Sequence, residues 1–275
     1  MKVPIPTLHL FPLLDQKLIE LLRSLSPTEW QQHTRAKLWT VKDIAAHLLD
    51  GNLRTLAMSR DRYFGEAPPE QNTYPVLVKY LNQLNADWVR AAKRVSPIVL
   101  IELLESTGKA YAEHLQTLDP FGEAIFSVGW AGEERSFNWF HIAREYTEKW
   151  HHQQQIREAV NKPGIASKEL YYPVLDTFVQ ALPHHYRDVI APLGAGLKVN
   201  ITGEAGGSWF LLRENQHWRI TKESVPHHAE VILDDDTAWK LFTKGLSSAE
   251  AHHHVVLKGD AALVNPFLSL VAVMA

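Results

Sequence analysis

Histidine and carboxylate side chains are the residues of this sequence that could do chemistry. The chain of 275 residues has 15 His and 31 Asp plus Glu, but no Cys. Without cysteine there is no disulfide, no thiolate nucleophile and no cysteine-ligated metal. Any metal ion must therefore be bound by histidine nitrogen and carboxylate oxygen, which are the ligands of many catalytic zinc and non-haem iron sites.

One short stretch carries such groups at helical spacing. In EKWHHQQQ, residues 148–155, Glu148 and His152 are four positions apart. On a helix they lie about 40° apart, whereas His151 lies about 60° from Glu148 in the other direction. The Glu148/His152 pair is thus the better aligned for a shared metal ion. Gln155 follows on the same face and could orient a ligand histidine.

A third protein ligand must come from another segment, and His47 in DIAAHLLDGN is the candidate. It lies at the edge of the apolar face of a predicted helix. An ordinary core or boundary histidine would occupy the same position, so the pattern around His47 leaves both interpretations open.

The apolar residues around 148–155 also leave two interpretations. The strongest apolar stripe of this segment lies roughly opposite Glu148 and His152, and consists of Trp139, Ala143, Tyr146 and Trp150. Either the polar face is solvated, or the helix is packed on both sides and its polar face lines an interior cleft.

Helical periodicity predicts the elements that must position these groups. Apolar residues recur at helical spacing in the segments 14–25, 40–64, 73–94, 97–117 and 136–160. Thr40, with Asp43 three positions later, predicts a capping box at the start of the second segment. The pattern predicts an all-α helical bundle over residues 1–163.

A different pattern follows the Asn161-Lys162-Pro163-Gly164 break. One more helix is predicted at 167–190, and strands are predicted at 197–203, 207–214, 217–223 and 229–234. Helices at 236–244 and 260–273 flank a further predicted strand at 253–259. The pattern predicts a smaller α+β domain over residues 164–275.

Charge and hydropathy limit the class of function. The 28 Lys plus Arg and 31 Asp plus Glu give a net charge of −3, which offers no basic surface for nucleic acid. No apolar run approaches the roughly 20 residues needed to span a bilayer, and the first residues lack a signal-peptide pattern. We therefore expect a cytoplasmic protein that acts on a small molecule, with neither a nucleic acid nor a membrane as partner. A homodimer formed through the bundle stays open.

Two stretches resemble the signatures of a known family. LSPTEWQQHTRAKLWTVKDIAAHLLDGNLR resembles the first signature of the mycothiol-dependent maleylpyruvate isomerase family, within the wider DinB-like superfamily, in which a Trp precedes a helix with a ligand His. REYTEKWHHQQQIREAV resembles the second signature, E-x-x-x-H on the last bundle helix. The resemblance implies a DinB-like metal-binding bundle in which His47, Glu148 and His152 are the ligands.

The resemblance extends to the C-terminal part and also has departures. The segment from DDDTAWKLF to the closing residues resembles a sterol-carrier-type α+β domain. Many relatives have Asp where this chain has Gln155, which removes a charge beside the ligand histidine. The family's isomerase also uses an arginine of its C-terminal domain, for which Arg213 and Arg219 are open candidates.

The family resemblance implies a divalent-metal-dependent enzyme, with Zn²⁺ as the expected metal and a low-molecular-weight thiol such as mycothiol as cofactor. It would act on a small organic substrate as an isomerase or an S-transferase, because a metal-bound thiol is held as the nucleophilic thiolate. Two alternatives stay open. One is a metal-dependent hydrolase, and the other is a non-catalytic protein that binds an apolar ligand in the sterol-carrier-like domain.

Overall fold

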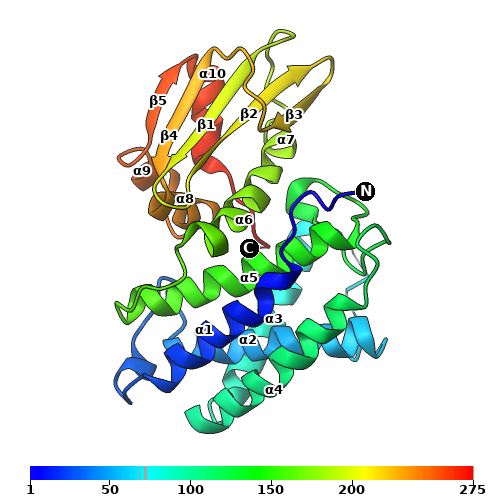
Figure 1. Ribbon diagram of the computed structural model, residues 1–275, viewed down its shortest axis with the longest axis vertical. Helices are drawn as coiled ribbons and strands as arrows, with labels where there is room; N and C mark the ends of the chain where they lie inside the picture. Colours follow the sequence, from blue (N-terminus) through cyan, green and yellow to red (C-terminus); the bar gives the residue numbers. More distant parts are fainter. Residues whose placement is uncertain (68, 71–72, 275) are drawn as a thin grey trace.

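The computed structural model describes residues 1–67, 69–70 and 73–274. A helical bundle forms one part of the molecule, and a mixed sheet with its helices forms the other (Figure 1). Helix α5 runs between the two parts. None of the helices in the described ranges is long and apolar enough to span a membrane.

The bundle contains five long helices: α1 (Phe11–Arg23), α2 (Val41–Thr55), α3 (Tyr74–Ala92), α4 (Pro97–Gln116) and α5 (Asn138–Ala159). They match the predicted helices within a few residues, except that α2 gives way to a π-helical turn at Leu56–Arg60. Thr40 and Asp43 form the expected capping box, since each side chain accepts the other's backbone N–H. Short 3₁₀ turns lie at Leu8–Leu10, Glu29–Gln31 and Gly129–Ala131.

The C-terminal part begins with helices and then forms the sheet. Its helices are α6 (Lys168–Phe178), α7 (Leu182–His185), α8 (Asp235–Phe242), α9 (Ser248–Ala251) and α10 (Ala261–Val264). Its strands are β1 (Gly196–Thr202), β2 (Gly207–Glu214), β3 (His217–Thr221), β4 (Ala229–Asp234) and β5 (Val256–Gly259). The strand order is β3-β2-β1-β4-β5, with β1 and β4 parallel and the other pairs antiparallel. The predicted fold class, an all-α bundle followed by a smaller α+β domain, is confirmed.

Two predicted helices are wrong in extent. The helix expected over 167–190 is divided into α6, a 3₁₀ turn at Val179–Ala181 and the short α7. The helix expected over 260–273 is reduced to α10 and a 3₁₀ segment at Asn265–Ser269. A proline stands at the start of each interrupted piece, Pro183 in α7 and Pro266 in the last segment, and proline cannot donate the backbone hydrogen bond that a continuing α-helix requires.

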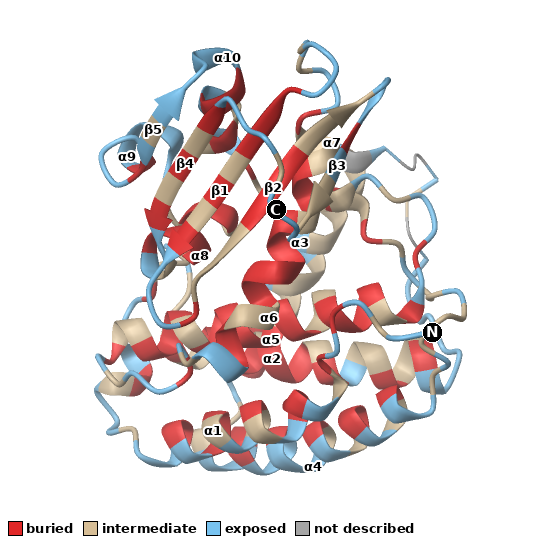
Figure 2. Cartoon of the chain, turned by 45° about the horizontal axis from the view of Figure 1, so that its top comes forward, coloured by how far each residue is buried: buried red, intermediate tan, exposed pale blue. Residues whose placement is uncertain are grey.

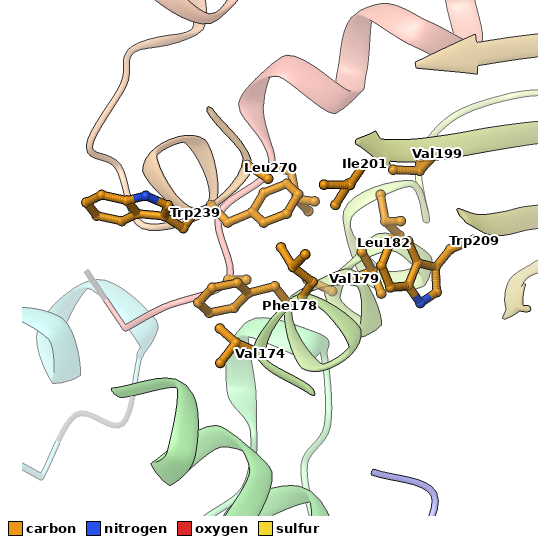
Figure 3. Packing of buried hydrophobic residues seen from close by; sticks show 14 of the residues in the cluster. Val174, Phe178, Val179, Leu182, Val199, Ile201, Trp209, Trp239 and Leu270 are labelled. Atoms are coloured by element: carbon orange, nitrogen blue, oxygen red, sulfur yellow. The ribbon is translucent and has the colours of Figure 1, made fainter. Parts of the chain in front are cut away.

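One hydrophobic core joins the two parts. Buried residues of the bundle, such as Phe11 and Trp150, belong to the same cluster as buried residues of the sheet and its helices. Figure 3 shows this packing, in which Val174 and Phe178 of α6 lie below residues of β1, β2 and α8. A second cluster fills the bundle between α1, α2, α4 and the end of α5. The predicted domain boundary after residue 163 falls in the linker between α5 and α6 and stays a prediction.

Candidate metal centre

Helix α5 is packed on both sides, which explains how polar side chains come to be buried on it (Figure 2). On one face, Trp150 stacks on Tyr171 of α6 with ring centroids 4.0 Å apart. The opposite face points into the bundle and carries a stripe of polar residues. We call this the polar stripe; it consists of His141, Arg144, Glu145, Glu148, His151, His152 and Gln155. Of the two interpretations left open by the sequence, the helix packed on both sides is therefore the correct one.

Three groups of the polar stripe could hold one metal ion. The ligand atoms of Glu148, His151 and His152 all lie within 4.8 Å of one another. Glu148 Oε2 and His152 Nε2 are 3.6 Å apart. His151 and His152 are buried, with exposed fractions of 4% and 9%. The structure thus brings together the predicted pair on α5 and adds His151, which the ideal-helix angles had set aside.

His47 lies beside this group on α2. Its ring meets that of His152 edge-on, with centroids 4.7 Å apart. His47 Nδ1 is buried and has no hydrogen-bond partner. A buried polar atom without a partner costs about 1–3 kcal/mol, so an unpaired ring nitrogen here is a feature that a bound cation would explain.

Hydrogen bonds fix the orientation of the two α5 histidines. His152 Nδ1 donates to Gln155 Oε1 at 2.9 Å, and His151 Nδ1 donates to the carbonyl oxygen of Thr147 at 2.9 Å. With Nδ1 as the donor, Nε2 of each ring carries the lone pair. This is the tautomer selection that surrounding acceptors perform in metal sites, and Gln155 makes the contact expected of a residue that orients a ligand.

Burial and neighbouring charges set the protonation states. Burial, aided by the charges of His152 and Arg54, holds the pKa of His47 well below its usual range. Burial and His152 lower the pKa of His151 to about 4. Burial opposes ionisation of Glu148, but its interactions with His152, His151 and Arg144 outweigh this effect and lower the pKa of the carboxyl. Neutral imidazole and ionised carboxylate are the forms that bind metal.

A second polar network lies one turn towards the N-terminus of α5. Arg144 Nη2 bonds with His141 Nδ1 at 2.8 Å and with Glu145 Oε1 at 2.8 Å. The other oxygen of Glu145 accepts a hydrogen bond from the Tyr111 hydroxyl of α4 at 2.7 Å. Arg144 Nε is buried and has no partner. No sequence pattern marks Arg144 as a site residue, because a hydrogen-bond donor without a partner becomes visible only in the folded chain.

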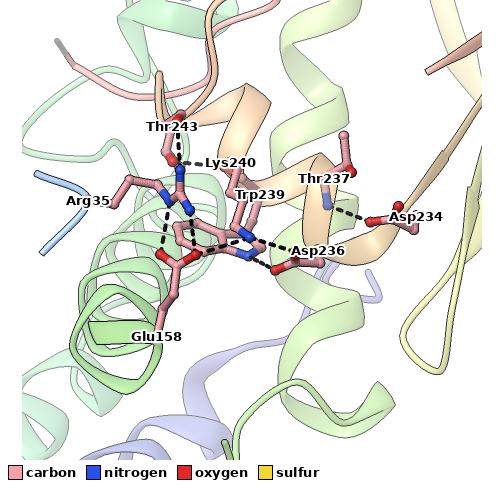
Figure 4. Close-up of polar contacts among 9 residues, drawn as sticks. Arg35, Glu158, Asp234, Asp236, Thr237, Trp239, Lys240 and Thr243 are labelled. Atoms are coloured by element: carbon pink, nitrogen blue, oxygen red, sulfur yellow. Dashed lines mark hydrogen bonds and ion pairs between the residues drawn. The ribbon is translucent and has the colours of Figure 1, made fainter. Parts of the chain in front are cut away.

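The segment before α2 connects the metal-centre region to the C-terminal part. Trp39 packs against His47, with ring centroids 4.9 Å apart. Arg35, four residues earlier, donates from Nε to Glu158 Oε2 at 2.9 Å and from Nη1 to the Gly245 carbonyl at 3.2 Å. Lys240 of α8 also pairs with Glu158, at 3.1 Å (Figure 4). The Glu158 carboxylate at the end of α5 therefore binds Arg35 of the bundle and Lys240 of the C-terminal part.

A cleft of about 680 Å³ lies beside this network. Its walls come from the 33–37 segment, the end of α5, the α8–α9 connection and the 268–271 segment. His47, Glu148 and His152 do not line it.

The two arginines considered as C-terminal-domain site residues lie elsewhere. The Arg213 guanidinium lies over the Trp218 ring, 5.6 Å from its centroid. Arg219 donates from Nε to Glu214 at 2.7 Å. Both contacts are made within the β2–β3 hairpin, so these contacts give neither arginine a role at the α2–α5 cluster.

Comparison with solved structures supports the fold. The crystal structure of a mutant of the mycothiol-dependent maleylpyruvate isomerase matches with a TM-score of 0.55 and 12% identity, covering 92% of each chain. A structure of the isomerase itself matches with a TM-score of 0.53 at the same identity and coverage. A UbiJ-SCP2 ubiquinone synthesis protein aligns with 37% of this chain and 90% of its own at 20% identity, but its TM-score of 0.25 is too low to relate the folds. No curated protein is similar at a significant level.

The sequence itself matches a family profile. The profile of the mycothiol maleylpyruvate isomerase N-terminal domain matches residues 11–157, from the start of α1 almost to the end of α5. This range contains His47, Glu148, His151 and His152, and it covers more than half of the chain. The chain therefore belongs to the mycothiol maleylpyruvate isomerase N-terminal domain family.

Proposed function

We propose that this protein is a divalent-metal-dependent enzyme that works with a low-molecular-weight thiol to isomerise a small organic substrate. The observation that carries the proposal is the convergence of Glu148, His151 and His152 on one point of α5, beside the unpaired Nδ1 of His47. Family membership supplies the class of reaction.

The residues present fit a zinc ion. The available donors are imidazole nitrogens and one carboxylate, and zinc is commonly held by such sets with three protein ligands and an open position. We assign His47, Glu148 and His152 as the ligands. This set gives a partner to the otherwise unpaired Nδ1 of His47. It takes one ligand from α2 and two from α5. His151 lies within reach of the same point and is the rival for the third position.

When bound, a divalent ion would lower the pKa of a coordinated thiol and hold it as the nucleophilic thiolate. The protein's part is to hold the ligands and to limit water. Gln155 and Thr147 fix the histidine tautomers, and Trp39 covers the side of His47 with an apolar ring. The chain has no cysteine, so the thiol must come from a separate molecule.

The two solved relatives are named for maleylpyruvate and mycothiol. We propose the same general chemistry for this chain: a cis-unsaturated acid as substrate and mycothiol or a similar thiol as cofactor. An S-transferase would use the same site. No observation favours a hydrolase. The alternative of an apolar ligand bound in the C-terminal domain also gains no support, because the chain's own side chains fill the inner face of the sheet (Figure 3).

Metal content and thiol-dependent turnover test the proposal together. Zinc-loaded wild type should retain about one ion per chain after dialysis, measured by elemental analysis, and should isomerise maleylpyruvate when mycothiol is added. His152→Ala and Glu148→Ala should lose the ion, whereas the surface variant His217→Ala should keep it. Absence of stoichiometric metal, or retention of the ion by His152→Ala, would contradict the metal site.

The same measurement separates the two ligand sets. If His47 is the third ligand, His47→Ala releases the ion and His151→Ala keeps most of it. The reverse result would assign the position to His151.

A further inference from the structure

Arg144 is a partly buried cation whose Nε is buried and has no hydrogen-bond partner. Its side chain is 15% exposed, and its Nε is shielded from solvent without any partner. Arginine presents five donors in a rigid plane that matches a carboxylate. The contacts with His141 and Glu145 hold the guanidinium in place but leave the Nε N–H unsatisfied.

Arg144 lies about one helical turn from Glu148 of the candidate metal centre. Arg144 precedes Glu148 by four residues, so the two side chains share one face of α5. Its positive charge is also among those that lower the pKa of Glu148. The residues around Glu148 thus include two buried nitrogens without a hydrogen-bond partner. They are Arg144 Nε on α5 and His47 Nδ1 on α2.

Two other cationic side chains of α2 and α5 have their hydrogen-bond donors paired with acceptors. Arg54 of α2 pairs with Asp50 at 3.0 Å and donates to Asn85 at 3.2 Å. Lys149 of α5 is bound to Asp15 of α1 at 2.8 Å. Neither has a buried donor without a partner, which leaves Arg144 as the group suited to an incoming anion.

We propose that Arg144 is the substrate-binding residue that accepts a carboxylate group next to the metal centre, and so selects unsaturated acids over neutral analogues. The inference rests on the proposed function, because it assigns the substrate class of that same site. The ion pair with Glu145 would position the guanidinium, and the substrate carboxylate would take up the free Nε donor.

Equilibrium binding of maleate to the zinc-loaded protein tests this assignment. Titration calorimetry should show that wild type binds maleate and binds its neutral diamide far more weakly. Arg144→Gln should weaken maleate binding by roughly 10- to 100-fold, the usual range for a hydrogen bond to a charged group. Arg144→Lys should fall between the two, because it keeps the charge but loses the planar donor set. The control Arg90→Gln, which removes an exposed guanidinium paired with Asp87, should bind maleate within about twofold of wild type.

A second variant guards against misfolding. Arg144→Gln leaves the partly buried Glu145 carboxylate without its cationic partner, so the double variant Arg144→Gln with Glu145→Gln removes both charges together. It should fold, keep its zinc and show the same loss of maleate binding. The inference is overturned if wild type does not bind maleate, or if both Arg144→Gln proteins bind it as wild type does.

These outcomes are distinct from failure of the proposed function. Loss of the proposed function would appear as absent metal or absent thiol-dependent turnover in wild type. Failure of the Arg144 assignment would appear as unchanged maleate affinity in variants that still hold stoichiometric zinc.

Discussion

Trp39 lies against His47, with ring centroids 4.9 Å apart, and also approaches His152, at 6.3 Å. One indole thus contacts a histidine from each of the two helices that form the candidate metal centre. Because packing of this kind restricts the imidazole rings, we expect Trp39 to help keep the candidate ligands in place.

Replacing Trp39 should therefore weaken metal binding without removing a ligand. We expect Trp39→Ala to lower zinc affinity by roughly 10-fold, within the range seen for residues that support metal ligands. Trp39→Phe should retain most of the affinity, because a phenyl ring still packs on His47. Competition with a chromophoric chelator measures the difference, and equal affinity of Trp39→Ala and wild type would contradict the role.

Gln155 should have a comparable effect through a hydrogen bond. Gln155→Ala removes the acceptor of the His152 Nδ1 proton, so zinc affinity should fall roughly 10- to 100-fold. Gln155→Glu should restore or exceed the wild-type affinity, because a carboxylate makes the imidazole a stronger ligand. Gln16→Ala, at an exposed position of α1, serves as the control. Wild-type affinity in Gln155→Ala would show that His152 needs no such partner.

Glu158 should contribute to stability through the two cations it binds. Glu158→Gln weakens the contacts with Arg35 and Lys240, which come from different parts of the molecule. The site is partly buried, so we expect a loss of about 1–3 kcal/mol in the free energy of unfolding, measured by urea denaturation. Glu105→Gln, which disrupts an exposed pair with Arg23, should change it by less than about 1 kcal/mol. Equal effects of the two variants would mean that the Glu158 network adds no more than a surface pair.

Trp150 should be among the most sensitive positions of the core. It is fully buried, stacks on Tyr171 and donates from Nε1 to the Ile165 carbonyl at 2.9 Å. Trp150→Ala should cost about 3–5 kcal/mol. Because the core is continuous across α5, we also expect fluorescence and circular dichroism to report one shared unfolding transition. Two separate transitions in wild type would show that the bundle and the sheet unfold independently.

His141 should make the protein less stable in acid. Burial and the charge of Arg144 lower its pKa from 6.5 to about 4. Above pH 6.5 the ring is neutral in both the folded and the unfolded chain, so it has no effect on stability there. As the pH falls from 6.5 towards 4, the unfolded chain gains the proton first, and stability falls by about 3 kcal/mol in total.

The variant His141→Asn isolates this contribution, because it keeps an acceptor for Arg144 but does not titrate. The stability difference between wild type and variant, measured by urea denaturation at several pH values, should shift in favour of the variant between pH 6.5 and 4. A difference that is constant over this range would refute a lowered pKa for His141.

The helices and the α5 donor pair could be predicted because both depend on local periodicity. Glu148 and His152 share a helical face whatever the rest of the chain does. His151 was underestimated, because the angle between Cα positions ignores the reach of an imidazole side chain. The structure shows its ring nitrogen oriented by Thr147 and close to the same point.

Other features depend on contacts that no local pattern contains. The unused nitrogens of His47 and Arg144 become visible only when α2 and α4 pack against α5. The long helices expected near Pro183 and Pro266 fail for a local reason that could have been applied, because each proline interrupts the backbone hydrogen bonding.

The two differently used faces of α5 also limit how this architecture can vary through evolution. The face with Tyr146 and Trp150 packs against Tyr171 and Trp239 of the C-terminal part, while the opposite face carries the groups of the candidate metal centre. If this bundle were fused to an unrelated C-terminal domain, the residues on the Tyr146/Trp150 face would have to change, whereas those on the opposite face would have to stay the same. Recombination between relatives should therefore tolerate a junction after the sheet more readily than one between α5 and α6.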